Sequence, residues 1–180
     1  MKLKRLVFIS FVLLSALQLQ AQKKISGPLI HEYGETFTVP QPDLEVDTEA
    51  EYKVVFDIAQ APEDPAALNP YFNTVARFLN MHAYAKVDKA QLKPVLVVHG
   101  SAAYGLLKNK FYKEKFGVDN PNLDLLNKLH ALDIPVILCG QTAGARAISV
   151  EKRWGKTQVA LSAMTALIHY QNLDYALIPF

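Results

Sequence analysis

The only cysteine in the chain, Cys139, stands where thiol chemistry is feasible. A short apolar run at residues 134–139 ends at this cysteine, and Gly140, Gln141 and small helix-compatible residues follow it. A strand that turns directly into a helix would place the thiol at the helix N-terminus, where the helix dipole favours the thiolate. The pattern indicates a reactive thiolate at Cys139. The alternative is a structural role, because free cysteine is among the most buried residue types.

Two polar residues stand near the ends of other predicted strands. Asp57 lies in the apolar run at residues 53–59, and His99 ends the run at residues 94–99. In an open parallel sheet the carboxyl ends of the strands share one edge, so both side chains could lie on the same edge as Cys139. There His99 could hold a thiolate, act as an acid or base, or bind a ligand; a histidine bonded to a loop carbonyl is the alternative.

Other kinds of site find less support in the sequence. The five histidines are scattered, and no pair has metal-ligand spacing, so we predict no metal site and no cofactor. The glycines after His99 match neither a Walker sequence nor a dinucleotide-binding sequence, and no nucleophile elbow is present. Arg146 could pair with an anion or with a partner subunit, and a solvated arginine is the alternative.

Apolar runs and helical patterns alternate along the chain from Tyr52 onward. We expect strands at residues 53–59, 94–99, 134–139 and 175–178. We expect helices that begin at Asn69 and Pro70, near Ser101 and at Asn120 and Pro121, a short one after Cys139, and one over residues 159–171. This alternation predicts an α/β fold, a single-domain sandwich with a mainly parallel sheet of about five strands and helices on both faces.

The first 51 residues differ from this pattern. Residues 1–21 have a basic start, an apolar stretch and a plausible cleavage point after Ala21, which predicts a signal peptide; an uncleaved anchor or a buried helix is the alternative. Residues 22–51 are rich in proline and acidic side chains and predict an N-terminal extension, before a domain at residues 52–180. We therefore expect a periplasmic or secreted protein without stable membrane insertion after cleavage.

The charge balance of the mature chain gives no support for nucleic-acid binding. The full chain has 19 basic and 17 acidic residues, and residues 1–21 contain three of the basic ones, which leaves a net charge of −1. No basic run remains after cleavage. A single cysteine also excludes an intramolecular disulfide, so the fold must rely on its core.

Several segments taken together resemble the DsrE/DsrF-like family, over about residues 52–180. The resemblance is carried, in this order, by residues 53–58, 97–100, 136–141 with 146–148, 160–167 and 175–180. It implies an α/β sandwich with a parallel sheet, and commonly a homo-oligomer such as a trimer or hexamer. In the sulfur-relay members a cysteine at a strand end carries sulfur as a persulfide between partner proteins, and Cys139 matches that kind of position. The version with Gly140 and Gln141 resembles an exported branch, whereas the relay members are cytoplasmic.

Two functions follow from the residues and the resemblance. In the first, Cys139 accepts sulfane sulfur as a persulfide and passes it to a thiol, with a thiol or sulfur-donor protein as partner. His99 and the Gly140 and Gln141 backbone would stabilise the sulfur anion, and Gly100 and Arg146 complete the predicted binding residues. In the second, the protein is a non-enzymatic oligomer that binds a small ligand in the same cleft, with Cys139 structural. The sequence leaves open whether the protein is an enzyme.

Overall fold

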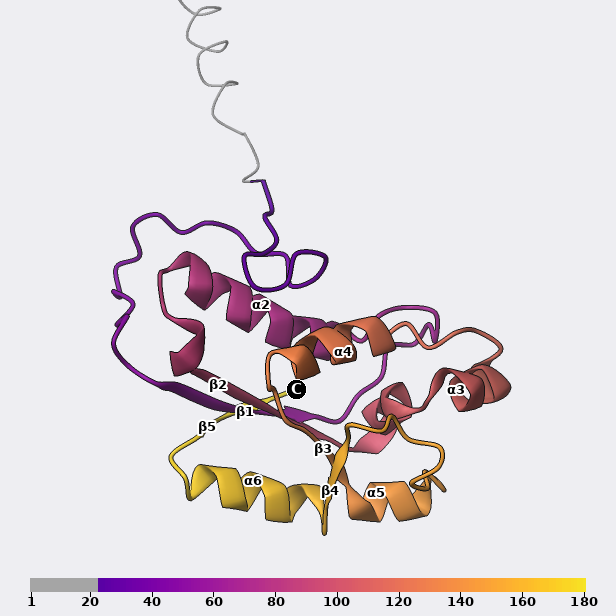
Figure 1. Ribbon diagram of the computed structural model, residues 1–180. Helices are drawn as coiled ribbons and strands as arrows, with labels where there is room; N and C mark the ends of the chain where they lie inside the picture. Colours follow the sequence, from indigo (N-terminus) through magenta and orange to yellow (C-terminus); the bar gives the residue numbers. More distant parts are fainter. Residues whose placement is uncertain (1–22) are drawn as a thin grey trace, which may run out of the picture.

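A five-stranded sheet forms the centre of the protein (Figure 1). The computed structural model describes residues 23–180, so the signal-peptide prediction for residues 1–21 lies outside the described residues. All neighbouring strands are parallel, which confirms the predicted α/β sandwich with about five parallel strands. The sheet order is β4-β3-β2-β1-β5, and the strands are β1 (Tyr52–Ile58), β2 (Leu92–Val98), β3 (Val136–Cys139), β4 (Gln158–Ala160) and β5 (Ala176–Pro179).

Helices cover both faces of this sheet, as the sequence predicts (Figure 1). One face carries α2 (Pro70–Tyr84) and α4 (Leu123–Ala131), and the other carries α5 (Gly140–Ala145) and α6 (Ala163–Gln171). The remaining helical elements are the 3₁₀ helices η2 (Lys89–Gln91) and η3 (Gly100–Leu106), and α3 (Asn109–Phe116). No helix within residues 23–180 is long and apolar enough to cross a membrane.

The alternation of side chains along the strands divides the core into two parts. On β2, Leu96 and Val98 face the larger core beneath α2 and α4, whereas Val95 and Val97 face a smaller core beneath α6. Both sets are almost completely buried. Burial on both faces explains why β2 is a continuous apolar run rather than an alternating one.

One predicted helix start is confirmed, and the structure corrects two others. Asn69 caps α2, because its side chain accepts a hydrogen bond from the Tyr71 N–H at 2.9 Å. Asn120 does not cap α4, which begins only at Leu123; its buried amide instead donates to the carbonyl groups of Gly105 and Leu107. Ser101 lies inside η3, where its hydroxyl accepts from the backbone N–H of Ala61 at 2.9 Å.

The prediction of a helix over residues 159–171 is wrong for the first residues of that range. Gln158 to Ala160 form β4, an edge strand that pairs with Ile137 to Cys139 of β3. Helix α6 starts three residues later, because the Ser162 hydroxyl accepts from the Thr165 N–H at 3.0 Å and so fixes the helix start. The structure therefore places a strand and a turn next to Cys139 where the sequence suggested a helix.

The buried side-chain amide of Asn80 binds part of the N-terminal segment to α2. The Asn80 side chain is fully buried; its Oδ1 accepts from the Ile30 N–H at 3.0 Å, and its Nδ2 donates to carbonyl groups of Ile30, Tyr33 and Gly34. Gly34 has a φ of +67°, and a Cβ there would lie 2.4 Å from backbone atoms of α2. This contact requires glycine, and it holds the segment outside the sheet.

Candidate functional site

The thiol of Cys139 lies at the junction of β3 with α5. Cys139 is the last residue of β3 and the N-cap of α5, and its Sγ accepts a hydrogen bond from the Thr142 N–H at 3.4 Å. The side chain points into the smaller core, beside Ala163 and Ala166 of α6. Only 5% of the residue is exposed, so the thiol is close to the surface but nearly closed off from solvent.

The surroundings of the sulfur favour its anionic form. Burial alone would raise the pKa of the Cys139 thiol, but hydrogen bonds from the side chain and backbone of Thr142 and from the N–H groups of Ala163 and Gln141 outweigh this effect. The pKa therefore lies below its ordinary value. Since Gln141 and Thr142 belong to α5 and Ala163 begins α6, the first turns of two helices supply donors to one sulfur atom.

Asp57 and His99 form a hydrogen-bonded pair on the neighbouring strands. The His99 Nε2 lies 2.8 Å from the Asp57 Oδ1, and both side chains are roughly three-quarters buried or slightly less. Because a carboxylate only accepts hydrogen bonds, the Nε2–H donates and the bond fixes the orientation of the ring. The histidine is thus bonded to a carboxylate rather than to the loop carbonyl that was the alternative.

The strand register brings this pair and the thiol to one face of the sheet. Val97 pairs with Asp57 and with Ile137, and Val98 pairs with Leu138, so continuing this register by one residue puts His99 next to Cys139. Alternation from Val97 and Ile137, both in the smaller core, puts His99 and Cys139 on the α6 face. Adjacent strands lie about 4.8 Å apart, which makes His99 an immediate neighbour of the cysteine strand.

The two predicted binding glycines allow backbones to approach closely. Gly100 has a φ of +54°, and a Cβ there would lie 2.4 Å from the Ala59 carbonyl oxygen. A Cβ on Gly140 would lie 2.6 Å from the Ala160 carbonyl oxygen, so this glycine lets α5 start against β4. Gln141 is exposed, and its Nε2 donates to the Leu161 carbonyl at 3.2 Å, which connects α5 to the turn before α6.

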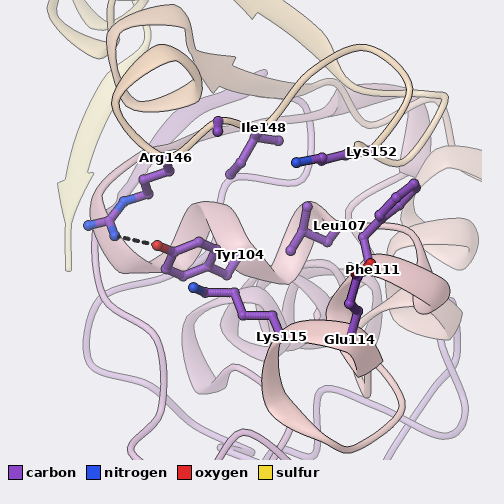
Figure 2. Close-up of a pocket in the computed structure, with 9 residues that line it drawn as sticks. Tyr104, Leu107, Phe111, Glu114, Lys115, Arg146, Ile148 and Lys152 are labelled. Atoms are coloured by element: carbon purple, nitrogen blue, oxygen red, sulfur yellow. Dashed lines mark hydrogen bonds between the residues drawn. The ribbon is translucent and has the colours of Figure 1, made fainter.

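Arg146 lies at the far end of α5 and belongs to a different group of residues. Its Nη1 donates to the Tyr104 hydroxyl at 3.1 Å, and its guanidinium carbon lies 4.9 Å from the centre of that ring. Tyr104, Lys115 and Lys152 line a pocket together with Arg146 (Figure 2). Sequence reasoning missed these three residues, which come from separate elements and share no motif.

Thr142 and Ala163 were also missed. Thr142 stands three positions after the cysteine, where an N-cap side chain receives its hydrogen bond, so correct placement of the helix start would have identified it. Ala163 reaches Cys139 only through the fold. Among residues 23–180, no group of three or more His, Cys, Asp or Glu side chains is arranged to hold a metal ion.

Comparison with known proteins identifies the family to which this fold and strand-end site belong. The model of the DsrE/DsrF-like family matches residues 53–180, and the chain belongs to that family. No curated protein sequence matches the chain.

Solved structures of two other proteins share the fold. MTH1491 from Methanobacterium thermoautotrophicum, described as a protein of unknown function, has 15% sequence identity and a TM-score of 0.53; the match covers 72% of this chain and all of that one. The YchN protein of E. coli has 19% identity and a TM-score of 0.51, over 71% of this chain and 98% of its own. At these identities the likeness concerns the fold alone.

Proposed function

We propose that this protein carries sulfur, with Cys139 as the site of a persulfide. The observation that supports this function most strongly is the set of donors from Gln141, Thr142 and Ala163 around one sulfur atom, which favours the thiolate that attacks sulfane sulfur. A terminal persulfide sulfur is also anionic near neutral pH and benefits from the same partial positive charge at the two helix starts. Membership of the DsrE/DsrF-like family agrees with this proposal without specifying it.

The chemistry needs a donor with sulfane sulfur, such as a low-molecular-weight hydropersulfide. The Cys139 thiolate attacks the outer sulfur of the donor; a new S–S bond forms, the donor S–S bond breaks, and the donor leaves as a thiolate. In the second step, an acceptor thiolate attacks the outer sulfur of the Cys139 persulfide and releases the Cys139 thiolate. No net oxidant is required, because the sulfane sulfur moves from one thiolate to the next.

The position of the Asp57–His99 pair supports a role for His99 in this transfer. His99 stands beside Cys139 in the strand register, and the 2.8 Å bond to Asp57 fixes its ring. Because the Nε2–H is bonded to Asp57, only the imidazolium form has a second N–H, at Nδ1, and its positive charge would stabilise negative charge on the sulfur during transfer. The pair is therefore assigned a supporting electrostatic role, and the thiol is assigned the covalent one.

The sole cysteine makes the test specific, because every thiol adduct reports on Cys139. The folded protein would be incubated with glutathione hydropersulfide, and intact mass would be measured before and after reduction. We expect a reversible gain of one sulfur atom that is absent in Cys139→Ser. A gain seen only after unfolding in urea would show that the native thiol is sealed, and would reject the carrier function.

The 5% exposure of Cys139 favours a second candidate function, in which the cysteine is a core residue of a non-enzymatic ligand-binding oligomer. Its contacts with Ala163 and Ala166 in the smaller core are those of a small apolar side chain. This function predicts that Cys139→Ala keeps the native fold and all ligand binding. The carrier function predicts that the same variant folds but accepts no sulfur.

We also propose that the protein forms a homo-oligomer, a trimer or hexamer, through the outer side of α6. Leu161, Met164 and Ile168 are 73%, 71% and 59% exposed and lie close together in sequence on and just before this helix. Apolar exposure of this extent on one helix is typical of a surface that is covered in an assembly. Sedimentation of the protein and of Met164→Glu should show an oligomer that the substitution dissociates; a monomer in both samples would reject this arrangement.

Export to the periplasm or outside the cell is the remaining part of the proposal, together with a thiol or sulfur-donor protein as partner. Export rests on the basic and apolar pattern of residues 1–21. Sequencing the N-terminus of the protein recovered from a periplasmic fraction should find a start near Gln22. Recovery of the intact chain from the cytoplasm would reject export and leave the thiol chemistry to be judged separately.

A further inference from the structure

The pocket beside Tyr104 contains an unusual concentration of positive charge. It has a volume of about 400 Å³, within the range of small-molecule sites, and lies between η3, α3 and the loop that follows α5. Arg146, Lys115 and Lys152 supply three cations to its lining, against the single carboxylate of Glu114. Within residues 23–180, none of the three cations forms an ion pair with a carboxylate.

Two of these cations are held around one aromatic ring. The Lys115 Nζ lies 4.5 Å from the centre of the Tyr104 ring, and Arg146 donates to the Tyr104 hydroxyl at 3.1 Å. In Figure 2, Lys115 and Lys152 extend from opposite sides toward the space beside Tyr104 and Leu107. The cation–π contacts position the charges without neutralising them, so an anion would find donors already in place.

The charges act on Tyr104 itself. The hydrogen bond from Arg146, together with the nearby charge of Lys115, lowers the pKa of the Tyr104 phenol despite opposition from burial. The two cations therefore favour negative charge on an oxygen atom at this position.

The walls of the pocket are fixed by backbone hydrogen bonds. The Lys108 N–H donates to the Lys152 carbonyl at 2.8 Å, and the Trp154 N–H donates to the Leu106 carbonyl at 2.7 Å. These bonds hold the loop that carries Lys152 against the end of η3. Ala147, with a φ of +50°, turns the chain after Arg146 so that Ile148 returns to the core. The cations thus stand on a built surface rather than on a free loop.

We propose that this pocket binds a small organic anion, with its carboxylate or sulfonate among Arg146, Lys115 and Lys152 and its apolar part against Leu107, Phe111 and Ile148. An arginine fork suits the paired oxygens of either acid group. The apolar residues in the lining favour an organic anion over a bare inorganic one. The site is separate from Cys139, His99 and Asp57, which do not line it, and it stands whether or not the thiol carries sulfur.

The test is a titration of the protein with benzenesulfonate, followed by amide chemical shifts, beside parallel titrations with sulfate and with neutral benzyl alcohol. We expect saturable shifts at Tyr104, Phe111 and Arg146 with benzenesulfonate, and weaker effects with the other two probes. Arg146→Gln and Lys152→Gln should each weaken binding about tenfold, the effect of losing one hydrogen bond to a charged group. Lys156→Gln, which removes an exposed lysine that does not line the pocket, should leave the affinity unchanged.

Three results would overturn the proposal. Equal shifts with benzyl alcohol would show that charge is irrelevant, and an equal affinity for sulfate would show that the pocket binds oxyanions in general. Affinity that falls equally in Arg146→Gln and Lys156→Gln would indicate non-specific attraction. Spectra of the unliganded variants establish that each is folded, and Lys115→Gln provides a further pocket variant.

Discussion

The His99 Nε2 lies 2.8 Å from the Asp57 Oδ1 across the ends of β1 and β2, directly beside the strand that ends in Cys139. Asp57 near the end of β1, His99 directly after β2 and Cys139 at the end of β3 therefore lie at the carboxyl ends of three neighbouring strands, on one face of the sheet. Two of the three already interact, and the third receives donors from α5 and α6 instead. In this arrangement Asp57 orients the imidazole of His99. The sulfur of Cys139 is stabilised separately, mainly by backbone N–H groups.

If His99 assists sulfur transfer, its replacement should slow the reaction while leaving the thiol in place. His99→Gln should lower the rate of persulfide formation about a hundredfold, at the lower end of the effects of removing one group that stabilises developing negative charge. The measurement is the rate of the one-sulfur mass gain under excess donor. His82→Gln is the matched control, because His82 lies on α2 beside Tyr52 at the start of β1, at the opposite end of that strand from Asp57. An unchanged rate in His99→Gln would restrict the pair to a structural role.

The hydrogen-bond donors around Cys139 make a prediction about the pH dependence of its reactivity. The pKa of the thiol is lowered because the donors outweigh burial, so alkylation should reach its half-maximal rate at a lower pH than in a free cysteine peptide. Thr142→Val removes one donor and keeps the shape, and should shift the profile to higher pH. Alkylation by iodoacetamide across a pH series measures both. Coincident profiles for the variant and the unmodified protein would exclude a contribution from the Thr142 hydroxyl.

The buried amide of Asn80 should control attachment of the N-terminal segment. Asn80→Leu leaves the N–H of Ile30 and the carbonyl groups of Tyr33 and Gly34 without a partner, so we expect a loss of about 2–3 kcal/mol in unfolding free energy. Urea unfolding measures this change, and limited proteolysis should cut the variant between residues 23 and 51. Asn172→Leu, at the exposed end of α6, provides the control. Equal protease resistance in both variants would contradict the assignment.

Tyr33 should make the same segment sensitive to alkali. Burial raises the pKa of Tyr33 to about 12, and the hydrogen bond that its hydroxyl donates to Asp124 at 2.9 Å acts in the same direction. Because the folded pKa lies above the ordinary value of 10.0, the stabilising effect is complete below pH 10 and is lost as the pH rises through about 12. The stability difference between the protein and Tyr33→Phe should disappear over this range. Phenolate absorbance in which all tyrosines titrate together near pH 10 would refute it.

The strands that are buried on both faces were predictable, because a continuous apolar run such as that of β2 admits few other structures. The short strand β4 was not, since Val159 and Leu161 also fit the spacing of the helix that follows and both are exposed. Nothing in a three-residue edge strand separates it from a helix start, apart from the capping role of Ser162.

The candidate site was likewise predictable from the sequence only in part. Cys139 and His99 could be placed at strand ends because each follows an apolar run. The bond between His99 and Asp57 depends on the strand register, which the sequence does not specify. The pocket around Tyr104 is formed by three elements that meet only in the folded chain, so no sequence pattern identified Lys115 or Lys152 as binding residues.

The brevity of β4 has a consequence for how quickly Cys139 can react. This edge strand has three residues and, within residues 23–180, pairs only with β3. A short turn connects it to α6, whose first residue, Ala163, donates a backbone hydrogen bond to the sulfur. Detaching so short a strand breaks few hydrogen bonds, so local opening there requires far less free energy than global unfolding. The observed reactivity of the thiol would then equal its intrinsic reactivity multiplied by the fraction of time that β4 is detached.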